Sequence, residues 1–240
     1  WKIEKIEIDA AYNKERLTAY LFIPKNLSPP YQTIVIFPGS VVIYNRKFNY
    51  GPAVTRAFDF LLKSGRAVLY PILKGTHERG DELDSDLQEE SKFYKDHVIS
   101  WVQDISRSLD YLETRNDIVH DKFGYYGYSW GSAMSGVVCA NEPRLKAAVL
   151  HVGGLMMQKT FPEVDPLNFF PRMKIPSLML NGKNDTFFPL ETSQKPMFRL
   201  IGAPEKDKKI ILYEGGHLVP KSELMKESLS WYDKYLGPVK

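Results

Sequence analysis

Short apolar runs recur along the chain and predict a series of strands. The first two runs read as outer strands, joined by a turn at residues 13–15. The later runs are nearly continuously apolar, as expected for strands covered on both faces. The predicted strands are residues 5–10, 17–24, 33–37, 67–70, 122–126, 147–151, 177–180 and 210–213.

Between these runs, apolar residues return every three or four positions, which is typical of amphipathic helices. The clearest stripe runs from Val98 to Leu112, after a polar loop at residues 74–90. A second stripe runs from Val54 to Leu62 and ends at Gly65. A helix of small residues is expected at 132–140, and a closing helix from Leu224 to Leu236.

Strands that alternate with helices predict an α/β fold with a mostly parallel sheet and helices on both faces. The chain of 240 residues suits one domain, and we expect residues 1–240 to form it. Residues 156–173 lie between two predicted strands and lack strong periodicity. They are long enough for a short cap segment but too short for a separate lid domain.

Composition excludes several classes of function. The formal charge is +3, and the Lys and Arg residues are spread along the chain, so we expect no nucleic-acid partner and no anionic membrane surface. Cys139 is the single cysteine, so neither an intrachain disulfide nor a cysteine-based metal cluster can form. The histidine and carboxylate spacings call for no metal, and we expect no cofactor.

Localisation is only weakly indicated. No apolar stretch approaches the roughly 20 residues needed to span a bilayer, and a lone cysteine fits a cytoplasmic protein. The chain begins at Trp1, so we expect that a signal peptide or an upstream domain precedes it in the full-length protein.

Residues 127–131 read Gly-Tyr-Ser-Trp-Gly and fit the pattern G-x-S-x-G. This spacing places a serine on a sharp strand-to-helix turn with its hydroxyl exposed, and glycines let the neighbouring backbone pack closely. A predicted strand precedes the motif and a small-residue helix follows it. Ser129 is therefore the candidate nucleophile, although a serine in an ordinary tight turn would give the same letters.

A nucleophilic serine needs a base, and in this type of site an acid and then a histidine follow the serine along the chain. His217 follows two glycines just beyond the last predicted strand and is the candidate base. Asp185, in a turn after the strand at 177–180, is the candidate acid that orients the imidazole. Asp165 is a rival acid in the cap-like segment.

Backbone N–H groups should stabilise the oxyanion, one of them from the residue after the nucleophile. That residue is Trp130, and Ser40, after the strand at 33–37, is the candidate for the second donor. Pocket contacts are further candidates. His77 and Arg79, in the loop after the strand at 67–70, and His151 at a strand end are proposed to touch substrate, although a charged pair that rigidifies the loop is the favoured reading of the first two.

With these residues in place, the whole chain resembles the α/β-hydrolase superfamily, and within it the dienelactone-hydrolase-like and prolyl-oligopeptidase-like branch. The resemblance extends to hydrolase domains attached to some bacterial serine/threonine-kinase-type proteins, over residues 70–79, 127–131, 162–172, 181–193 and 213–217. Two departures stand out. Dienelactone hydrolases use a cysteine nucleophile where this chain has Ser129, and Pro38 stands where many members have histidine.

The sequence thus predicts a serine hydrolase, most simply a carboxylesterase that acts on a small to medium ester through an acyl-enzyme. A serine peptidase or amidase of the prolyl-oligopeptidase-like type is the alternative, and acyl transfer differs from hydrolysis only by the exclusion of water. A sensing module without catalysis is the alternative of a different class. His97 and His120 have no predicted role.

Overall fold

The computed structural model describes residues 1–53 and 57–239. Its centre is one eight-stranded sheet in the order β1-β2-β4-β3-β5-β6-β7-β8. The pairs β1–β2 and β2–β4 are antiparallel, and every other pair is parallel. The strands are β1 (Lys2–Asp9), β2 (Arg16–Ile23), β3 (Tyr31–Phe37), β4 (Ala67–Pro71), β5 (Ile118–Tyr128), β6 (Leu145–His151), β7 (Ser177–Gly182) and β8 (Lys208–Tyr213).

The helices are short, apart from two. They are α1 (Val41–Tyr44), α2 (Tyr50–Ala53), α3 (Asp59–Lys63), α4 (Lys92–Glu113), α5 (Trp130–Ala133), α6 (Ser135–Asn141), α7 (Pro166–Phe169), α8 (Lys195–Leu200) and α9 (Lys221–Leu236). Single turns of other helix types lie at His77–Arg79, Phe170–Arg172, Leu190–Gln194 and Glu205–Asp207. In the described residues no helix is both long and apolar enough to cross a membrane.

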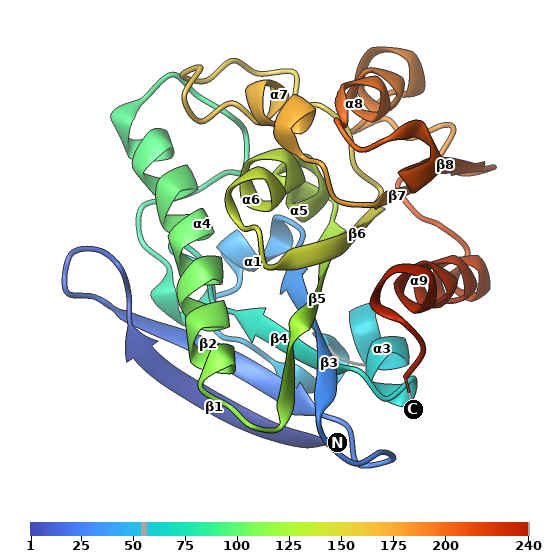
Figure 1. The fold of residues 1–240 in the computed structure, drawn as a ribbon. Helices are drawn as coiled ribbons and strands as arrows, with labels where there is room; N and C mark the ends of the chain where they lie inside the picture. The colour runs from blue at the N-terminus through green and yellow to red at the C-terminus, as the bar shows by residue number, and fades with distance from the viewer. Residues whose placement is uncertain (54–56, 240) are drawn as a thin grey trace.

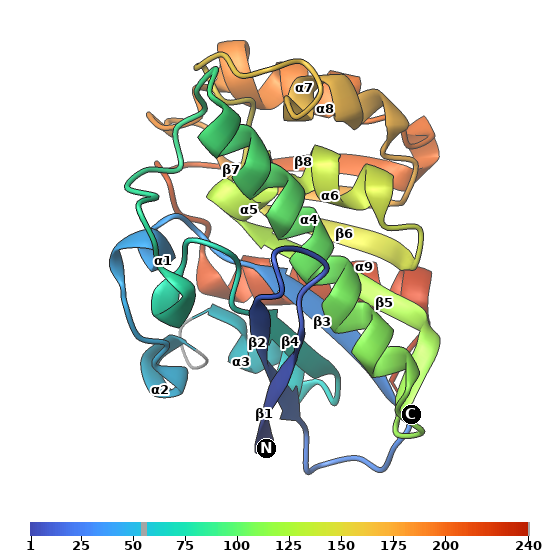
Figure 2. The ribbon, with the colours of Figure 1, turned by 90° about the vertical axis from the view of Figure 1, so that its left-hand side faces the viewer.

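The sheet separates two hydrophobic layers (Figures 1 and 2). On one face, α4 crosses the sheet and buries Trp101 and Ile105 against strand residues, with α5 and α6 beside it. On the other face, α3 and α9 bury Leu61 and Trp231 in a second cluster. Because β3 and β4 are buried along their whole length, most of their side chains are apolar on both faces, as the nearly continuous apolar runs indicated.

Every predicted strand is present, and the α/β fold with a mostly parallel sheet is confirmed. The turn at residues 13–15 joins β1 to β2, and Asn13 and Lys14 have positive φ there, as a tight hairpin of right-handed twist requires. The predicted small-residue helix is divided at Met134 into α5 and α6. Val54, the first residue of the predicted second stripe, lies outside the described residues, and α3 covers the end of that stripe.

The parallel strands all end at the same edge of the sheet, and this edge gathers the loops that follow β3, β5, β7 and β8. The register fixes their relative positions. Tyr128 at the end of β5 pairs with His151 of β6, which pairs with Leu180 of β7. Gly182 at the end of β7 pairs with Tyr213 at the end of β8. Residues far apart in sequence therefore meet at this carboxyl edge, where ligands bind in open α/β sheets.

Candidate active site

Ser129 lies on the sharp turn between β5 and α5, with φ 53° and ψ −107°. A residue other than glycine is strained at positive φ, and such strain occurs at functional turns that the surrounding structure holds. The two flanking glycines permit the turn. A Cβ on Gly127 would lie 2.6 Å from the Gly131 oxygen, and a Cβ on Gly131 would lie 2.1 Å from the Phe37 oxygen. The G-x-S-x-G spacing is thus a packing requirement of this turn.

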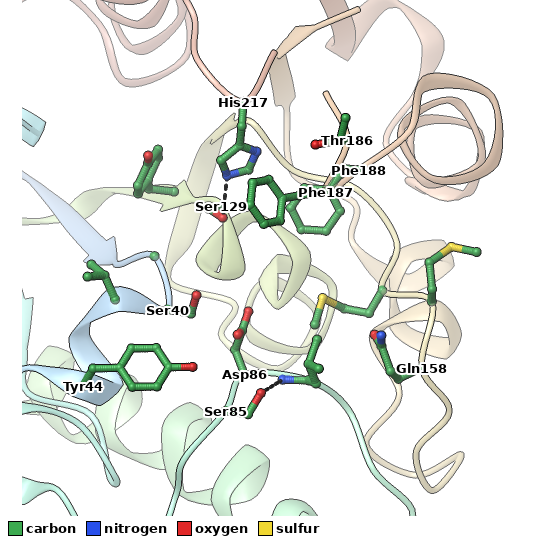
Figure 3. A pocket seen from close by; sticks show the side chains of 16 residues that line it. Ser40, Tyr44, Ser85, Asp86, Ser129, Gln158, Thr186, Phe187, Phe188 and His217 are labelled. Carbon is green, nitrogen blue, oxygen red and sulfur yellow. Dashed lines mark hydrogen bonds between the residues drawn. The ribbon is translucent and has the colours of Figure 1, made fainter. Parts of the chain in front are cut away.

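The base meets the serine at this edge (Figure 3), and the acid contacts the base from behind. The Ser129 hydroxyl is 2.8 Å from Nε2 of His217. The Nδ1 atom of the same ring is 2.7 Å from Oδ2 of Asp185. If Nδ1 carries the proton, it donates to the carboxylate, and Nε2 is left free to accept the proton of the serine hydroxyl.

Both loops that carry these groups are fixed by backbone hydrogen bonds. The Asp185 side chain is buried, and its Oδ1 accepts the N–H groups of Phe187 and Phe188 at 2.9 and 3.2 Å. Its other oxygen is thereby directed at the imidazole. The N–H of Asn184 donates to the Gly215 carbonyl at 2.8 Å, which ties the acid's loop to the loop of the base.

The rival acid has a different role. Asp165 caps the first turn of α7, where its Oδ1 accepts the N–H of Leu167 at 3.0 Å. The helix begins with Pro166, as is common at the first helical position. The structure therefore joins Asp185, and not Asp165, to the histidine.

The two candidate oxyanion donors lie on adjacent turns. Trp130 is the first residue of α5, so its N–H has no acceptor within the helix. The turn that holds Ser40 packs against the serine, since a Cβ on Gly39 would lie 2.8 Å from the Tyr128 ring and 3.6 Å from Ser129 Cβ. Within the described part of the chain, neither the Ser40 nor the Trp130 N–H donates to another backbone group.

An open pocket of about 590 Å³ leads to the serine. Apart from Ser40, Ser129 and His217, its walls come from residues that were not predicted from the sequence, and much of this wall is apolar and solvent-facing. The exposed fractions are 71% for Phe187, 64% for Met157 and 61% for Tyr44. Further lining residues are Gly39, Ser40, Val41, Ser85, Asp86, Leu87, Tyr128, Met156, Gln158, Thr186 and Phe188.

The start of the predicted cap segment contributes to this wall, since Met156 and Gln158 line the pocket (Figure 3). The rest of the segment, with α7 and the turn at Phe170–Arg172, packs on α6. The sequence contained one indication that these residues line the pocket. Residues 156–158 and 85–87 belong to irregular segments that follow strands at the carboxyl edge, where such pockets form. Which of their side chains reach Ser129 depends on how these loops fold.

Arg79 does not line the pocket, which corrects its candidate role as a substrate contact. Its guanidinium lies 2.6 Å from the buried Asp104 carboxylate and 2.7 Å from the Ile72 carbonyl. The Tyr12 hydroxyl hydrogen-bonds to both charged groups. Burial raises the pKa of Asp104, and the guanidinium opposes that rise. The pair attaches the loop after β4 to α4, in agreement with the favoured reading of a rigid loop.

His77 is also absent from the pocket wall. Its ring is buried between Phe48 and Tyr70, with centroids 5.3 and 6.2 Å away, and burial lowers its pKa. The neighbouring Glu78 accepts the N–H of Phe48 at 3.1 Å. Both side chains therefore hold the segment after α1 on the loop after β4, where neither contacts the serine.

His151 is buried behind the serine turn and does not line the pocket either. The Tyr126 hydroxyl lies 2.9 Å from its Nδ1, while its Nε2 has no hydrogen-bond partner among the described residues. Burial, and to a smaller extent the charge of His217, lowers the pKa of His151 to about 3. Its backbone carbonyl accepts the N–H of Ser129 at 2.9 Å, so this residue supports the turn.

The two histidines without a predicted role are occupied elsewhere. His97 on α4 is buried and hydrogen-bonds to Asp81 at 3.1 Å, whereas His120 on β5 is exposed and contacts the Arg115 carbonyl. In the described residues, no group of three or more His, Cys, Asp or Glu side chains is arranged to hold a metal ion.

The sequence family follows from a comparison with known families. The model of the family described as "Serine hydrolase (FSH1)" matches residues 62–229, which is more than half of the chain and includes all three hydrogen-bonded site residues. The chain belongs to the FSH1 serine hydrolase family. A Yersinia pestis protein provisionally named a carboxymethylenebutenolidase is 35% identical over 98 residues. That match covers 40% of this serine hydrolase and 36% of the relative, so the chain spans well under two thirds of the relative's length.

Solved structures show the same fold at low sequence identity. A cold-adapted esterase from an Arctic intertidal metagenomic library has a TM-score of 0.72 and 16% identity, over 99% of this serine hydrolase and 94% of the esterase. A Klebsiella pneumoniae protein provisionally named a dienelactone hydrolase has a TM-score of 0.73 and 19% identity, and the match covers 98% of this chain and 100% of that protein. The Pyrococcus furiosus esterase Pf2001 has a TM-score of 0.73 and 15% identity, and the match covers 98% of this chain and 93% of the esterase. The predicted resemblance to α/β-hydrolases of the dienelactone-hydrolase-like type is confirmed.

Proposed function

We propose that this serine hydrolase is a carboxylesterase that cleaves small to medium esters through an acyl-enzyme on Ser129. The continuous hydrogen-bond chain from the Ser129 hydroxyl through His217 to Asp185 carries the proposal. Serine is a weak nucleophile unless an adjacent base accepts its proton, and the base must itself be oriented by a third group. The described site provides both.

The reaction begins when Ser129 Oγ attacks the ester carbonyl carbon and its proton passes to Nε2 of His217. The buried Asp185 carboxylate stabilises the resulting imidazolium and remains ionised. The N–H groups of Ser40 and Trp130 donate to the oxyanion. When the tetrahedral intermediate collapses, the bond to the alcohol oxygen breaks, and His217 returns its proton to that oxygen.

Water then enters, and His217 removes its proton while the oxygen attacks the acyl carbonyl. The second tetrahedral intermediate expels the serine oxygen, which recovers its proton from the imidazolium. Each oxyanion donor contributes on the order of 3 kcal/mol to transition-state stabilisation in sites of this kind. The open apolar wall formed by Met157 and Phe187 suits the hydrocarbon part of an acyl or alcohol chain.

The name of the Yersinia pestis relative indicates a substrate that carries a carboxylate. Among the described residues that line this pocket there is no Lys or Arg to pair with such a group. A carboxylate would therefore lose its hydration without an ion-pair partner. We therefore propose that the substrate of this serine hydrolase is a different ester from the one in the relative's name.

Hydrolysis of p-nitrophenyl esters of increasing acyl length tests this proposal. We expect activity in the wild type and a loss of about 10⁴-fold or more in kcat/KM for Ser129→Ala and for His217→Ala. Ser85→Ala is the matched control, because Ser85 lines the same pocket but hydrogen-bonds only to the Leu87 N–H among the described residues. It should retain activity.

A fluorophosphonate probe separates the alternatives. Labelling of the wild type and of Ser85→Ala, but not of Ser129→Ala, would show an activated serine. Labelling without turnover of any ester would indicate a peptidase or amidase of narrow specificity. A folded wild-type protein that is neither labelled nor active would contradict the proposal and indicate a module without catalysis.

A further inference from the structure

One charged side chain on the pocket wall has no part in the proposed reaction. Asp86 lies in the loop between β4 and α4, and its carboxylate points into the pocket beside the Ser40 hydroxyl (Figure 3). In the described lining, apart from the imidazole of the base, every other side chain is uncharged. This carboxylate is therefore the negatively charged group of the described lining that a substrate meets on its way to Ser129.

The carboxylate is not neutralised by the protein. Burial raises the pKa of Asp86, the nearby Ser40 hydroxyl only partly opposes that rise, and no cation from the described part of the chain contributes to it. Most carboxylates of this chain form an ion pair with a cationic side chain. Asp104, for example, is paired with Arg79, and Glu142 is paired with Arg144. A partly buried carboxylate without a counterion gains most from a ligand that supplies one.

The surroundings of Asp86 also favour a cation over a neutral hydrogen-bond donor. The exposed rings of Tyr44 and Phe187 line the same pocket, and ring faces attract alkylammonium groups. The sulfur-containing side chains of Met156 and Met157 add polarizable surface that suits the methyl or methylene groups around such a nitrogen. A carboxylate and aromatic rings on the wall of one pocket are a combination that recognises an ammonium group attached to carbon.

We infer that Asp86 determines specificity and makes the pocket select esters whose alcohol or acyl part carries an alkylammonium group. The inference rests on the proposed esterase function and names its substrate class. Asp86 is a binding residue here and takes no proton in the reaction. The bonds that form and break remain those at Ser129.

Two pairs of esters isolate the charge. Choline butyrate and 3,3-dimethylbutyl butyrate place a trimethylammonium or a tert-butyl group of nearly equal size on the alcohol side. The p-nitrophenyl esters of 4-(trimethylammonio)butyrate and 5,5-dimethylhexanoate do the same on the acyl side. We expect kcat/KM to favour the cationic member of at least one pair by about tenfold, the combined effect of an ion pair and of ring contacts to a trimethylammonium group. About pH 8 suits the assay because the pKa of Asp86 is raised.

Asp86→Asn keeps the size of the side chain but removes the charge. The preference for the cation should fall several-fold, because the cationic ester loses more of its kcat/KM than the neutral ester does. Asp84→Asn is the matched control, because Asp84 is an exposed neighbour that does not line the pocket and its removal changes the net charge equally. It should retain the preference.

Three results would overturn the inference. The wild type could show no preference in either pair, Asp86→Asn could retain the preference, or Asp86→Asn could lower kcat/KM equally for both esters of a pair. The last result would mean that the carboxylate only positions Ser40. Each of them leaves ester hydrolysis itself intact, so each is distinct from a failure of the proposed function.

A binding measurement covers the case in which no ester is hydrolysed. In a Ser129→Ala background, titration calorimetry with choline butyrate and with its neutral isostere reports recognition without turnover. We expect the choline ester to bind about tenfold more tightly, and Asp86→Asn in the same background to reduce the difference several-fold. Equal affinities of the two esters would overturn the inference even if the protein has no esterase activity.

Discussion

The buried imidazole of His151 links the stability of this serine hydrolase to pH. Its pKa is about 3 in the folded protein, against about 6.5 for an unperturbed histidine. Between these two values the unfolded chain binds a proton that the folded chain does not bind. The free energy of unfolding must therefore fall as the pH falls through this window.

The size of the effect follows from the two pKa values. Between pH 7 and pH 5 the unfolded histidine gains most of its proton, whereas the folded one gains almost none. The calculated loss is about 2 kcal/mol of unfolding free energy, with a slope that approaches about 1.4 kcal/mol per pH unit below pH 6. The folded value hardly matters in this range, because any pKa below about 4 gives nearly the same loss.

Urea unfolding at pH 7, 6 and 5, followed by tryptophan fluorescence, measures this loss. His151→Gln retains a group that can accept from the Tyr126 hydroxyl but cannot titrate, so its loss between pH 7 and pH 5 should be smaller by about 2 kcal/mol. The buried His77 is present in both proteins, and its contribution of the same sign cancels. His120→Gln, which changes an exposed histidine, should retain the wild-type slope. Equal losses for wild type and His151→Gln would refute the reasoning, because the charged imidazole would then be solvated in the native protein.

Three further substitutions test the site and its supports. Asp185→Asn should lower kcat/KM on p-nitrophenyl esters by about 10³–10⁴-fold, because the amide would face His217 with its NH₂ group and favour the tautomer that cannot accept the serine proton. Arg79→Met should lower the urea unfolding free energy by about 3–5 kcal/mol by leaving Asp104 unpaired, while the folded fraction keeps its kcat/KM within a few-fold. Gly131→Ala should cost about 1–3 kcal/mol of stability in the same assay and reduce fluorophosphonate labelling, since its Cβ would lie 2.1 Å from a backbone oxygen.

The sheet could be predicted from the sequence because its signals are local. A strand buried on both faces, such as β3 or β7, contains a run of apolar residues, and this pattern is visible without any knowledge of its neighbours. The short helices α1 and α8 could not be predicted in the same way. They are too short to show a period, so their positions depend on tertiary contacts.

The candidate site also contains residues that local sequence patterns identify and residues whose roles depend on tertiary contacts. Ser129, Asp185 and His217 follow strands directly, so the common edge of a parallel sheet brings them together once the strands are placed. Arg79 also follows a strand at this edge, but its side chain turns away to the buried Asp104. The sequence contains both charges, but only the fold shows that they form a pair.

Asp86 could not be recognised in advance for a related reason. It lies in a segment with several acidic residues, and nothing in their order distinguishes it from its exposed neighbour Asp84. The distinction comes from the path of the loop between β4 and α4, which directs one of them to the wall beside Ser40.

The order of the strands places the members of the site on parts of the sheet with different solvent exposure. The nucleophile follows β5, which lies inside the sheet, whereas the base follows β8, the edge strand, whose residues are all partly or fully exposed. Edge strands have hydrogen bonds on one side only and open at a lower free energy than the core. Opening of β8 would separate His217 from Ser129 while Trp101 and Trp130 stay packed in the other half of the molecule. On heating, we therefore expect inactivation to precede the loss of packing around Trp101 and Trp130, so that opening of the sheet edge limits function.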